Sequence, residues 1–185
     1  MNEEGLKIIF LDIDGVLNSE VSVDYHIKNK SNEWLYYAPW YGHVKHVNHI
    51  IKHTGAKVVI SSTWRHFYDV RMILHLAGLV GDIIGKTPCC KSRIRGEEIK
   101  LFLQYVQMDD AKIEPEKREA LLNIKKELLY YHRINYSGLK IDNFVIIDDD
   151  TDMLDLTNNF VHVDSYYGLT RKNANKAIKI LNGDK

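Results

Sequence analysis

The chain has 185 residues, of which 45% are hydrophobic and 27% are charged, the balance of an ordinary soluble globular protein. Lys plus Arg and Asp plus Glu each total 25, so the formal net charge is zero and global basicity gives no reason to expect a nucleic-acid partner. No apolar run approaches the ~20 residues needed to cross a bilayer, so we expect no membrane contact.

The location and the redox state of the protein also follow from composition. The opening sequence MNEEGLKIIF is acidic and lacks the apolar core of a secretory signal. The only cysteines, Cys89 and Cys90, are adjacent. A bridge between neighbours would staple no loop, and two sulfurs are too few for a structural zinc site. We therefore expect free thiols and a cytoplasmic protein.

Short apolar runs alternate with segments of helical periodicity along the chain. The runs predict strands at 7–11, 57–60, 82–85, 143–147 and 160–163. The periodic segments predict helices at 41–53, 67–77, 96–106, 115–131 and 170–181. Strands alternating with helices indicate βαβ units, so the expected fold is a three-layer α/β/α sandwich around a mainly parallel, Rossmann-like sheet.

Two segments interrupt this alternation. Residues from about 18 to 41 are polar and aromatic without clear periodicity, and residues from about 109 to 137 insert a charged helix before the fourth strand. No internal repeat, low-complexity tract or Gly/Ser linker divides the chain. We expect one domain over residues 1–185, with a flap or small cap in the first segment and a helical insertion in the second.

Acidic and hydroxyl side chains follow three of the predicted strands at the point where each ends. These groups are Asp12–Gly15, Ser61–Ser62 and Asp148–Asp150. In an open parallel sheet, ligands bind outside the carboxyl ends of the strands, at a topological switch point. So many neighbouring carboxylates would repel one another. A Mg²⁺ ion, which prefers a few carboxylates with water and phosphate oxygens, relieves that repulsion.

The spacing of Asp12 and Asp14 favours two different chemical roles. One intervening residue lets both carboxylates face one pocket, and Gly15 permits a tight turn after them. One carboxylate can then attack phosphorus while the other handles the proton of the leaving group.

Three of these groups resemble the motifs of the haloacid dehalogenase (HAD) superfamily. The sequence DIDGVLN at 12–18 resembles its first motif, Ser61 its second, and Asp148 with Asp149 its acidic fourth. The segments SSTWR at 61–65, RGEEI at 95–99 and GLT at 168–170 are similar to a narrower branch. That branch contains phosphatase domains of RNA-repair enzymes, and RGEEI also resembles the phosphatase half of phage polynucleotide kinase–phosphatase.

The resemblance implies a mechanism. Asp12 would form an aspartyl-phosphate, and Asp14 would act as general acid and then general base. Mg²⁺ would be held by Asp12, Asp148, Asp149 and the backbone carbonyl of Asp14. The substrate would be a phosphorylated small molecule or a nucleic-acid terminus, and no protein partner is indicated.

The phosphate group would be bound by Ser61, Ser62 and a basic residue, and here the sequence departs from the family pattern. The third motif should supply a lysine, but the best candidate is Arg95, whose guanidinium can bind phosphate bidentately. Three further basic residues remain candidates for the same role: Lys91, Arg93 and Lys140.

Each of these groups also has a plain structural interpretation. Asp12 and Asp14 are common turn formers at strand ends. Asp150, Asp152 and Asp155 suit the amino terminus of a following helix, where acids are favoured. The basic stretch from 86 to 95 is either a patch for an anionic substrate or a solvated loop.

Two further clusters are open to both interpretations. His46, His49 and His53 fall on the side of the helix at 41–53 opposite its apolar residues, which indicates a solvated face rather than a zinc site. An aromatic cluster either packs the flap onto the core or contacts substrate. Its members are Trp34, Tyr36, Tyr37, Trp40 and Tyr41.

Three functions fit the motifs. The first is a Mg²⁺-dependent phosphomonoesterase acting on nucleic-acid ends, nucleotides or phosphorylated metabolites. The second is a receiver-like domain that stores a phosphoryl group, and the third is a catalytically silent phosphate-binding module. Asp14 favours the first, because turnover needs a general acid and base whereas storage does not.

Overall fold

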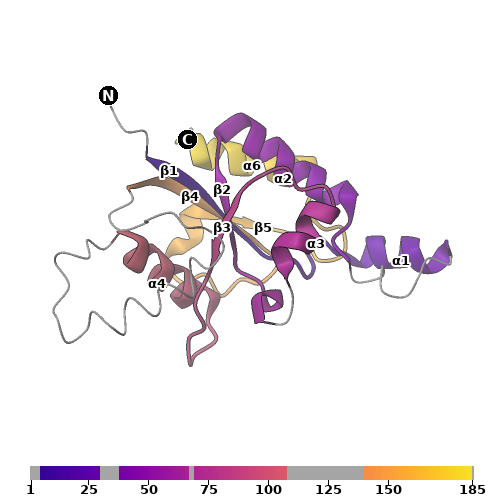
Figure 1. Ribbon diagram of the computed structural model, residues 1–185, viewed down its shortest axis with the longest axis horizontal. Helices are drawn as coiled ribbons and strands as arrows, with labels where there is room; N and C mark the ends of the chain where they lie inside the picture. The colour runs from indigo at the N-terminus through magenta and orange to yellow at the C-terminus, as the bar shows by residue number, and fades with distance from the viewer. Residues whose placement is uncertain (1–4, 30–37, 67–68, 108–139, 185) are drawn as a thin grey trace.

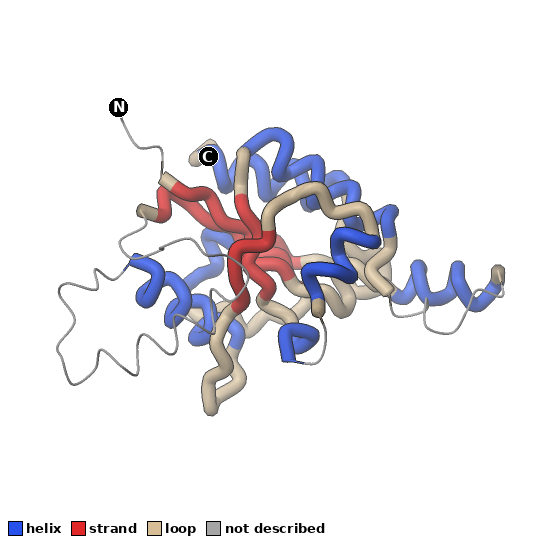
Figure 2. Tube along the Cα trace, in the orientation of Figure 1, coloured by secondary structure: helices blue, strands red, loops and turns tan. Residues whose placement is uncertain are grey.

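The computed structural model describes residues 5–29, 38–66, 69–107 and 140–184. A five-stranded sheet forms its centre, in the order β3-β2-β1-β4-β5, with every pair of neighbours parallel (Figures 1 and 2). The strands are β1 (Leu6–Leu11), β2 (Lys57–Ile60), β3 (Ile83–Lys86), β4 (Ile141–Asp148) and β5 (Phe160–His162). All five predicted strands are confirmed, with shifts of at most two residues at their ends.

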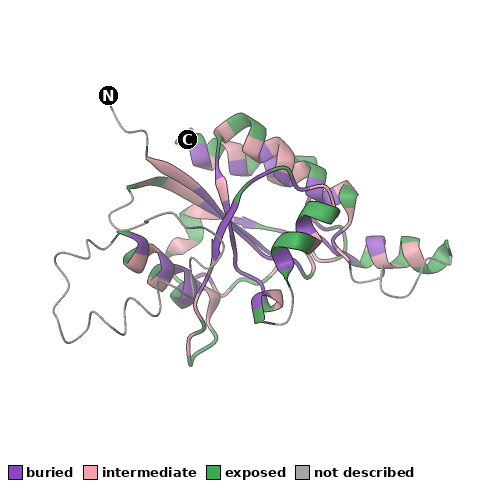
Figure 3. Ribbon diagram, in the orientation of Figure 1, coloured by how far each residue is buried: buried purple, intermediate pink, exposed green. Residues whose placement is uncertain are grey.

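Apolar side chains cover both faces of this sheet, and the strands run through its most buried part (Figure 3). One face packs against α2 (Tyr41–Thr54), α3 (Val70–Leu76) and α6 (Arg171–Asn182). The other face packs against α4 (Arg95–Gln107), where Phe10 meets Phe102 edge to face at 5.5 Å. The predicted three-layer α/β/α sandwich is confirmed. The continuous apolar runs mark strands buried on both sides.

Local sequence signals set several helix ends. Thr170 caps α6, its hydroxyl accepting from the Asn173 N–H while the Asn173 side chain accepts from the Thr170 N–H. Gly55 ends α2 in the left-handed conformation that glycine adopts without steric cost. The helix predicted at 67–77 begins at Val70 instead, with Asp69 as its cap, and a 3₁₀ helix, η2 (Thr63–His66), precedes it.

The strand order creates a switch point beside β1. From β1 the chain steps to β2 and then to β3, and it returns to the other side of β1 to form β4. The carboxyl ends of β1 and β4 therefore lie side by side, with Leu11 opposite Ile147. Ligand sites in open α/β sheets form at such a crevice.

The remaining segments are described only in part. Helix α1 (Glu20–Lys28) occupies the predicted flap and extends away from the sheet (Figure 1). The helix predicted at 115–131 and nearly all of the insertion at about 109–137 lie outside the described residues. None of the helices within the described ranges is both long and apolar enough to cross a membrane.

The histidines of α2 are less solvated than the sequence predicted. His53 is exposed, but His46 and His49 are half-buried, and burial together with the charge of Lys45 lowers the pKa of His46 to about 4. The predicted solvated face is therefore confirmed for His53 and only in part for His46 and His49, because α6 packs along α2. His43 is buried, with Nδ1 3.0 Å from the carbonyl of Leu169.

Candidate active site

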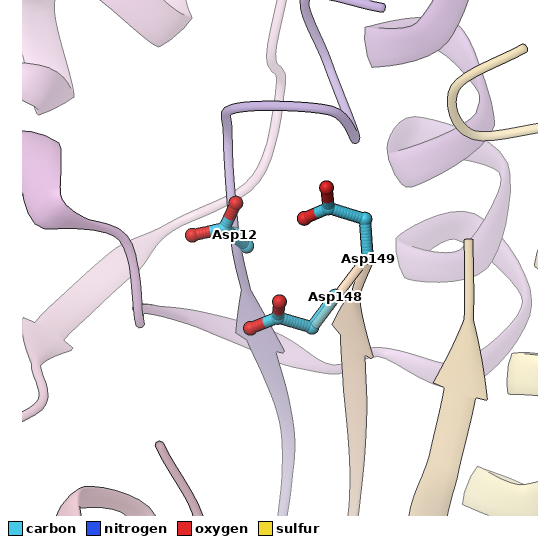
Figure 4. A group of neighbouring side chains, drawn as sticks. All are labelled: Asp12, Asp148 and Asp149. Atoms are coloured by element: carbon cyan, nitrogen blue, oxygen red, sulfur yellow. The ribbon is translucent and has the colours of Figure 1, made fainter. Parts of the chain in front are cut away.

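Three carboxylates meet at the switch point (Figure 4). Asp12 directly follows β1, Asp148 is the last residue of β4, and Asp149 comes next. One oxygen of each carboxylate lies within 4.8 Å of the others. The backbone also fixes this arrangement, because the N–H of Asp12 donates to the carbonyl of Ile147 on β4. The parallel register thus makes neighbours of acids that are far apart in the sequence.

Burial and mutual repulsion oppose ionisation of these acids. Burial raises the pKa of Asp12 well above its usual value, and the charge of Asp148 adds to the effect. Burial likewise raises the pKa of Asp148 to about 7, although Arg95 opposes it. The pKa of Asp149 is also raised, mainly by burial. A site that disfavours its own negative charge in this way suits a bound cation.

Arg95, the first residue of α4, holds a guanidinium against two of these acids. Its Nη2 lies 3.2 Å from an oxygen of Asp12. Its Nε lies 3.1 Å from Asp148, close enough for ion pairing although not aligned for a hydrogen bond. Burial acts to lower the pKa of Arg95, but Asp148, Asp12 and Glu98 together raise it above its usual value. The guanidinium therefore stays charged beside Asp12.

A second buried arginine supports this arrangement. Arg65 of η2 and Glu98 of α4 form an ion pair of 2.8 Å, with side chains only 3% and 5% exposed. Glu98 also lies 3.6 Å from Arg95 Nη1, and Arg65 Nη1 donates to the carbonyl of Ser62 at 2.8 Å. Glu98 thus joins the end of β2 to the helix that carries Arg95.

Asp14 has a different environment from Asp12. It is exposed, and the indole N–H of Trp64 lies 2.9 and 3.0 Å from its two carboxylate oxygens. The side-chain amide of Asn18 donates to the same carboxylate at 2.8 Å, and its oxygen accepts from the N–H of Gly15 at 3.0 Å. Trp64 and Asn18 therefore orient Asp14 while leaving it open to solvent.

Gly15 is required by close contact as well as by conformation. Its φ of 71° lies in the left-handed region, and a Cβ there would stand 2.3 Å from a carboxylate oxygen of Asp149. Any other residue at this position would push against Asp149.

The two predicted serines differ in their contacts. Both are fully buried. The hydroxyl of Ser61 has no hydrogen-bond partner within the described residues, whereas the hydroxyl of Ser62 accepts from the Trp64 N–H at 3.4 Å and so is engaged at the start of η2. A buried hydroxyl without a partner is costly unless a ligand satisfies it. Ser61 therefore fits the predicted phosphate role better than Ser62.

The structure separates the four basic candidates for the third motif. Arg95 reaches Asp12, and Arg93 is exposed and lines the adjoining cavity. Lys91 is exposed and is not one of the lining residues. Lys140 precedes β4, at the opposite end from Asp148, and pairs with Asp142 at 3.2 Å. Lys140 was a wrong candidate, because a strand of eight residues separates it from the site.

The prediction for the later acids needs correction. Asp152 does not cap a following helix. Its carboxylate accepts from the N–H of Arg95 at 2.9 Å and so caps α4, which precedes it in the sequence. Asp155 makes an ion pair with Lys100 of α4, and its side chain makes no capping bond to the 3₁₀ helix that follows. Asp150 is exposed and lines the cavity beside Arg95.

Only part of the aromatic cluster is described. The ring of Trp40 packs on Tyr25 of α1 with centroids 6.1 Å apart, and against His43 at 4.9 Å. For Trp40 these contacts favour packing of the flap over substrate contact. Tyr41 is 65% exposed, and the other members, at 34, 36 and 37, lie outside the described residues.

Four residues of the site were missed as functional candidates. They are Asn18, Trp64, Arg65 and Glu98. All four occur in the quoted segments DIDGVLN, SSTWR and RGEEI. Their clustering in those segments was the available signal, but their contacts cross between elements and cannot be inferred from spacing alone.

Two cavities adjoin the carboxylates. One, of about 410 Å³, lies on the Arg95 side and is lined by Thr63, Arg65, His66, Cys89, Arg93, Arg95, Glu98, Asp150 and Asp152. The other, of about 380 Å³, contains Asp14 and is lined by Asp14, Gly15, Asn18, Glu20, Val23, Asp24, Asp149 and Ser165. A substrate can thus approach the site from the Arg95 side or from the Asp14 side.

Comparison with protein families agrees with this geometry. The family described as the HAD domain in Swiss Army Knife RNA repair proteins matches residues 8–174. Comparisons with curated proteins and with solved structures gave no match. The matched span includes all of β1 except its first two residues, the whole of β4, and every site residue described above. The chain belongs to the HAD domain family of the Swiss Army Knife RNA repair proteins, a family of the HAD phosphohydrolase type.

Proposed function

We propose that the protein is a Mg²⁺-dependent phosphomonoesterase that works through an aspartyl-phosphate on Asp12. The observation that carries this proposal is the meeting of Asp12, Asp148 and Asp149 with the guanidinium of Arg95 at one switch point. The acids suit a hard cation and the guanidinium suits a phosphoryl oxygen, so the two halves of a phosphate site are side by side.

The donor set fits Mg²⁺. It consists of carboxylate oxygens at the mouth of a crevice, and burial raises the pKa values of all three acids. We propose that Asp12, Asp148, Asp149 and the carbonyl of Asp14 hold the ion. When bound, it would neutralise the acids and polarise the phosphoryl group.

The residues of the chain then divide the chemistry between them. A carboxylate oxygen of Asp12 attacks phosphorus as the bond to the leaving oxygen breaks, and Asp14 gives that oxygen a proton. In the second half, Asp14 takes a proton from the water that attacks the aspartyl-phosphate. Inorganic phosphate leaves and Asp12 is regenerated. The exposure of Asp14 supports its role as proton donor and acceptor, because the leaving oxygen and the attacking water must both reach its carboxylate.

Arg95 and Ser61 would bind the phosphoryl oxygens. The support for Arg95 is its ion-pair distance to Asp12, and for Ser61 it is the buried hydroxyl without a partner within the described residues. Positioned donors of this kind stabilise the charge that develops on a transferring phosphoryl group.

We further propose that the substrate is a phosphorylated nucleic-acid end. The description of the family names RNA repair, and the cavity that Arg95 lines is also lined by Arg93, whose exposed guanidinium suits a further phosphate. Nucleotides and small phosphorylated metabolites are the other substrates that the same chemistry would accept.

The test is a phosphatase assay with p-nitrophenyl phosphate, with and without Mg²⁺, on the wild type and on Asp12→Asn. We expect activity only with Mg²⁺, and a loss of roughly 10³-fold or more in the variant because the nucleophile is gone. Circular dichroism checks that the variant is folded. A stable aspartyl-phosphate without turnover would instead indicate a receiver-like module.

The substrate is tested with matched oligonucleotides that carry a 3′- or a 5′-phosphate, beside nucleotides and sugar phosphates. We expect a higher kcat/KM on an oligonucleotide end than on any of the small molecules. Equal or lower values on the oligonucleotides would reject the nucleic-acid end while leaving the phosphatase activity in place.

A further inference from the structure

The two adjacent cysteines have different surroundings. The sulfur of Cys89 is exposed and lies 2.9 Å from Nε2 of His66 and 3.6 Å from Nη2 of Arg65. Cys90 is half-buried. Burial raises the pKa of Cys90, and the charges of Glu98 and Glu97 raise it further. One thiol therefore faces a proton acceptor and a cation, while its neighbour faces acids.

The groups around Cys89 are held in place by the core of the site. Arg65 is buried, and its guanidinium is fixed by the carbonyl of Ser62 and the carboxylate of Glu98. His66 follows Arg65 at the end of η2. Because the arginine cannot turn away without breaking a buried ion pair, its charge remains beside the sulfur. A nearby cation and an imidazole are the features that favour a reactive thiolate.

The surroundings of His66 favour its neutral form. Burial lowers the pKa of His66, and the charges of Arg65 and Lys86 lower it further. The imidazole is therefore neutral near pH 7 and has a ring nitrogen that can accept the proton of the thiol.

Cys89 also shares a cavity with the proposed catalytic machinery. Its side chain, His66 and Arg95 all line the cavity of about 410 Å³. Arg95 in turn lies 3.2 Å from Asp12. A group attached to Cys89 would enter the space through which a phosphate reaches Arg95.

We propose that Cys89, paired with His66, is a reversible thiol-modification site that closes the Arg95 side of the site. The modifying agent is a low-molecular-weight disulfide. The reactivity of Cys89 is independent of the proposed function, whereas the effect on turnover rests on the proposed phosphatase activity.

The chemistry is a thiol–disulfide exchange. Nε2 of His66 takes the proton of Cys89, and the thiolate attacks one sulfur of the disulfide. The new bond joins Cys89 to that sulfur, and the other half leaves as a thiolate that receives the proton from His66. One disulfide is consumed and one is formed, so the exchange needs no further oxidant.

The reactivity is tested by brief alkylation of the folded protein with iodoacetamide, followed by mass spectrometry of the peptides. We expect Cys89 to be labelled about tenfold faster than Cys90, the internal control, because Cys89 is exposed and has His66 against its sulfur, whereas Cys90 is half-buried beside acids. His66→Gln should slow the alkylation of Cys89 and leave the alkylation rate of Cys90 unchanged. In denaturant the two should react equally. Equal rates in the folded protein, or a faster Cys90, would overturn the proposal.

The effect on turnover is tested with oxidised glutathione in the presence of Mg²⁺. The wild type and Cys90→Ser should lose most of their phosphatase activity and regain it with dithiothreitol. Cys89→Ser should keep its activity throughout. Full modification of Cys89 with unchanged activity would reject the closing role alone. A wild type without any phosphatase activity would reject the proposed function, and the labelling rates would still decide whether Cys89 is the reactive thiol.

Discussion

The two cavities beside Asp12 differ in the charged residues that line them. On the Arg95 side, three arginines are offset by three acids within one cavity, and Arg65 and Glu98 form a buried pair. On the Asp14 side, the cavity has four acids among its lining residues, namely Asp14, Glu20, Asp24 and Asp149, and no lysine or arginine. One side is a fixed and internally balanced network, and the other is acidic and open.

This difference separates two tasks, binding the phosphoryl group and transferring a proton, that need opposite surroundings. A phosphoryl group needs positive charge that is already oriented, which a buried network supplies without reorganisation. A proton donor needs access to solvent and freedom to change its charge. We infer that the phosphoryl group is held on the Arg95 side and that its leaving oxygen faces Asp14.

The largest expected effect comes from removing the shared carboxylate of the Arg95 side. Glu98→Ala leaves Arg65 buried without its partner, which should lower the free energy of unfolding by about 3–5 kcal/mol. Chemical denaturation measures this value. Asp24→Ala, a change on the open side, is the matched control and should cost far less. If the two variants lose similar stability, the contrast between a fixed and an open side is mistaken.

The next effect concerns Arg95 itself. Arg95→Ala should lower kcat by about 10²–10³-fold, because a preoriented donor to the phosphoryl group is lost. Arg95→Lys keeps the charge but not the planar guanidinium, so its kcat should lie between those of the wild type and the alanine variant. Steady-state kinetics with p-nitrophenyl phosphate measures both. An alanine variant with normal kcat would remove Arg95 from the mechanism.

A smaller effect is expected on the Asp14 side. Trp64→Phe keeps an aromatic ring but removes the N–H that contacts both oxygens of Asp14. Loss of one hydrogen bond to a charged group, about 1.5–3 kcal/mol, should lower kcat by roughly 10- to 100-fold and leave KM nearly unchanged. An altered KM with normal kcat would mean that Trp64 binds substrate and does not orient Asp14.

The smallest effect is a pH dependence of stability near α1. Nδ1 of His43 donates to the Leu169 carbonyl, so its Nε2 accepts from the hydroxyl of Ser19, the cap of α1. Burial lowers the pKa of His43 and Lys45 lowers it further, although the Leu169 carbonyl opposes them. The folded state thus favours neutral imidazole, and stability is lost as pH falls below the unfolded pKa of about 6.5.

The corresponding measurement is the free energy of unfolding at pH 7.5 and pH 5.5 for the wild type and for His43→Gln. The wild type should lose more stability on acidification than the variant, because only in the wild type does unfolding release a neutral ring that then takes up a proton. A variant with the same pH dependence would show that other histidines carry it.

The fold was largely predictable because local sequence patterns indicate which segments are buried strands and where helices begin. The runs KIIFL and KVVI are continuous because both faces of their strands are covered, and Thr170 occurs where α6 begins. The convergence of Asp12 and Asp148 was predicted from parallel strands with a switch point beside the first of them, together with the resemblance to the HAD motifs. The strands and helices themselves need only the helical or strand period.

The contacts that complete the site were not predictable in the same way. Asp152 caps a helix that precedes it, and Trp64 reaches back to Asp14 across the end of β2. Such contacts depend on how loops turn, which no periodicity encodes. The misplaced role of Lys140 has a different origin, because Lys140 precedes a predicted strand whose other end carries Asp148, so strand direction alone already argued against it.

The central position of β1 has a consequence for how such a domain can diversify. Asp12 follows a strand that is hydrogen-bonded on both edges, to β2 and to β4. Its backbone is therefore immobilised by two neighbours, and a shift would disrupt the whole sheet. Changes of substrate must then arise in the connections between strands, where insertions are tolerated. The backbone of Asp12 thus keeps its position while the connections around it vary.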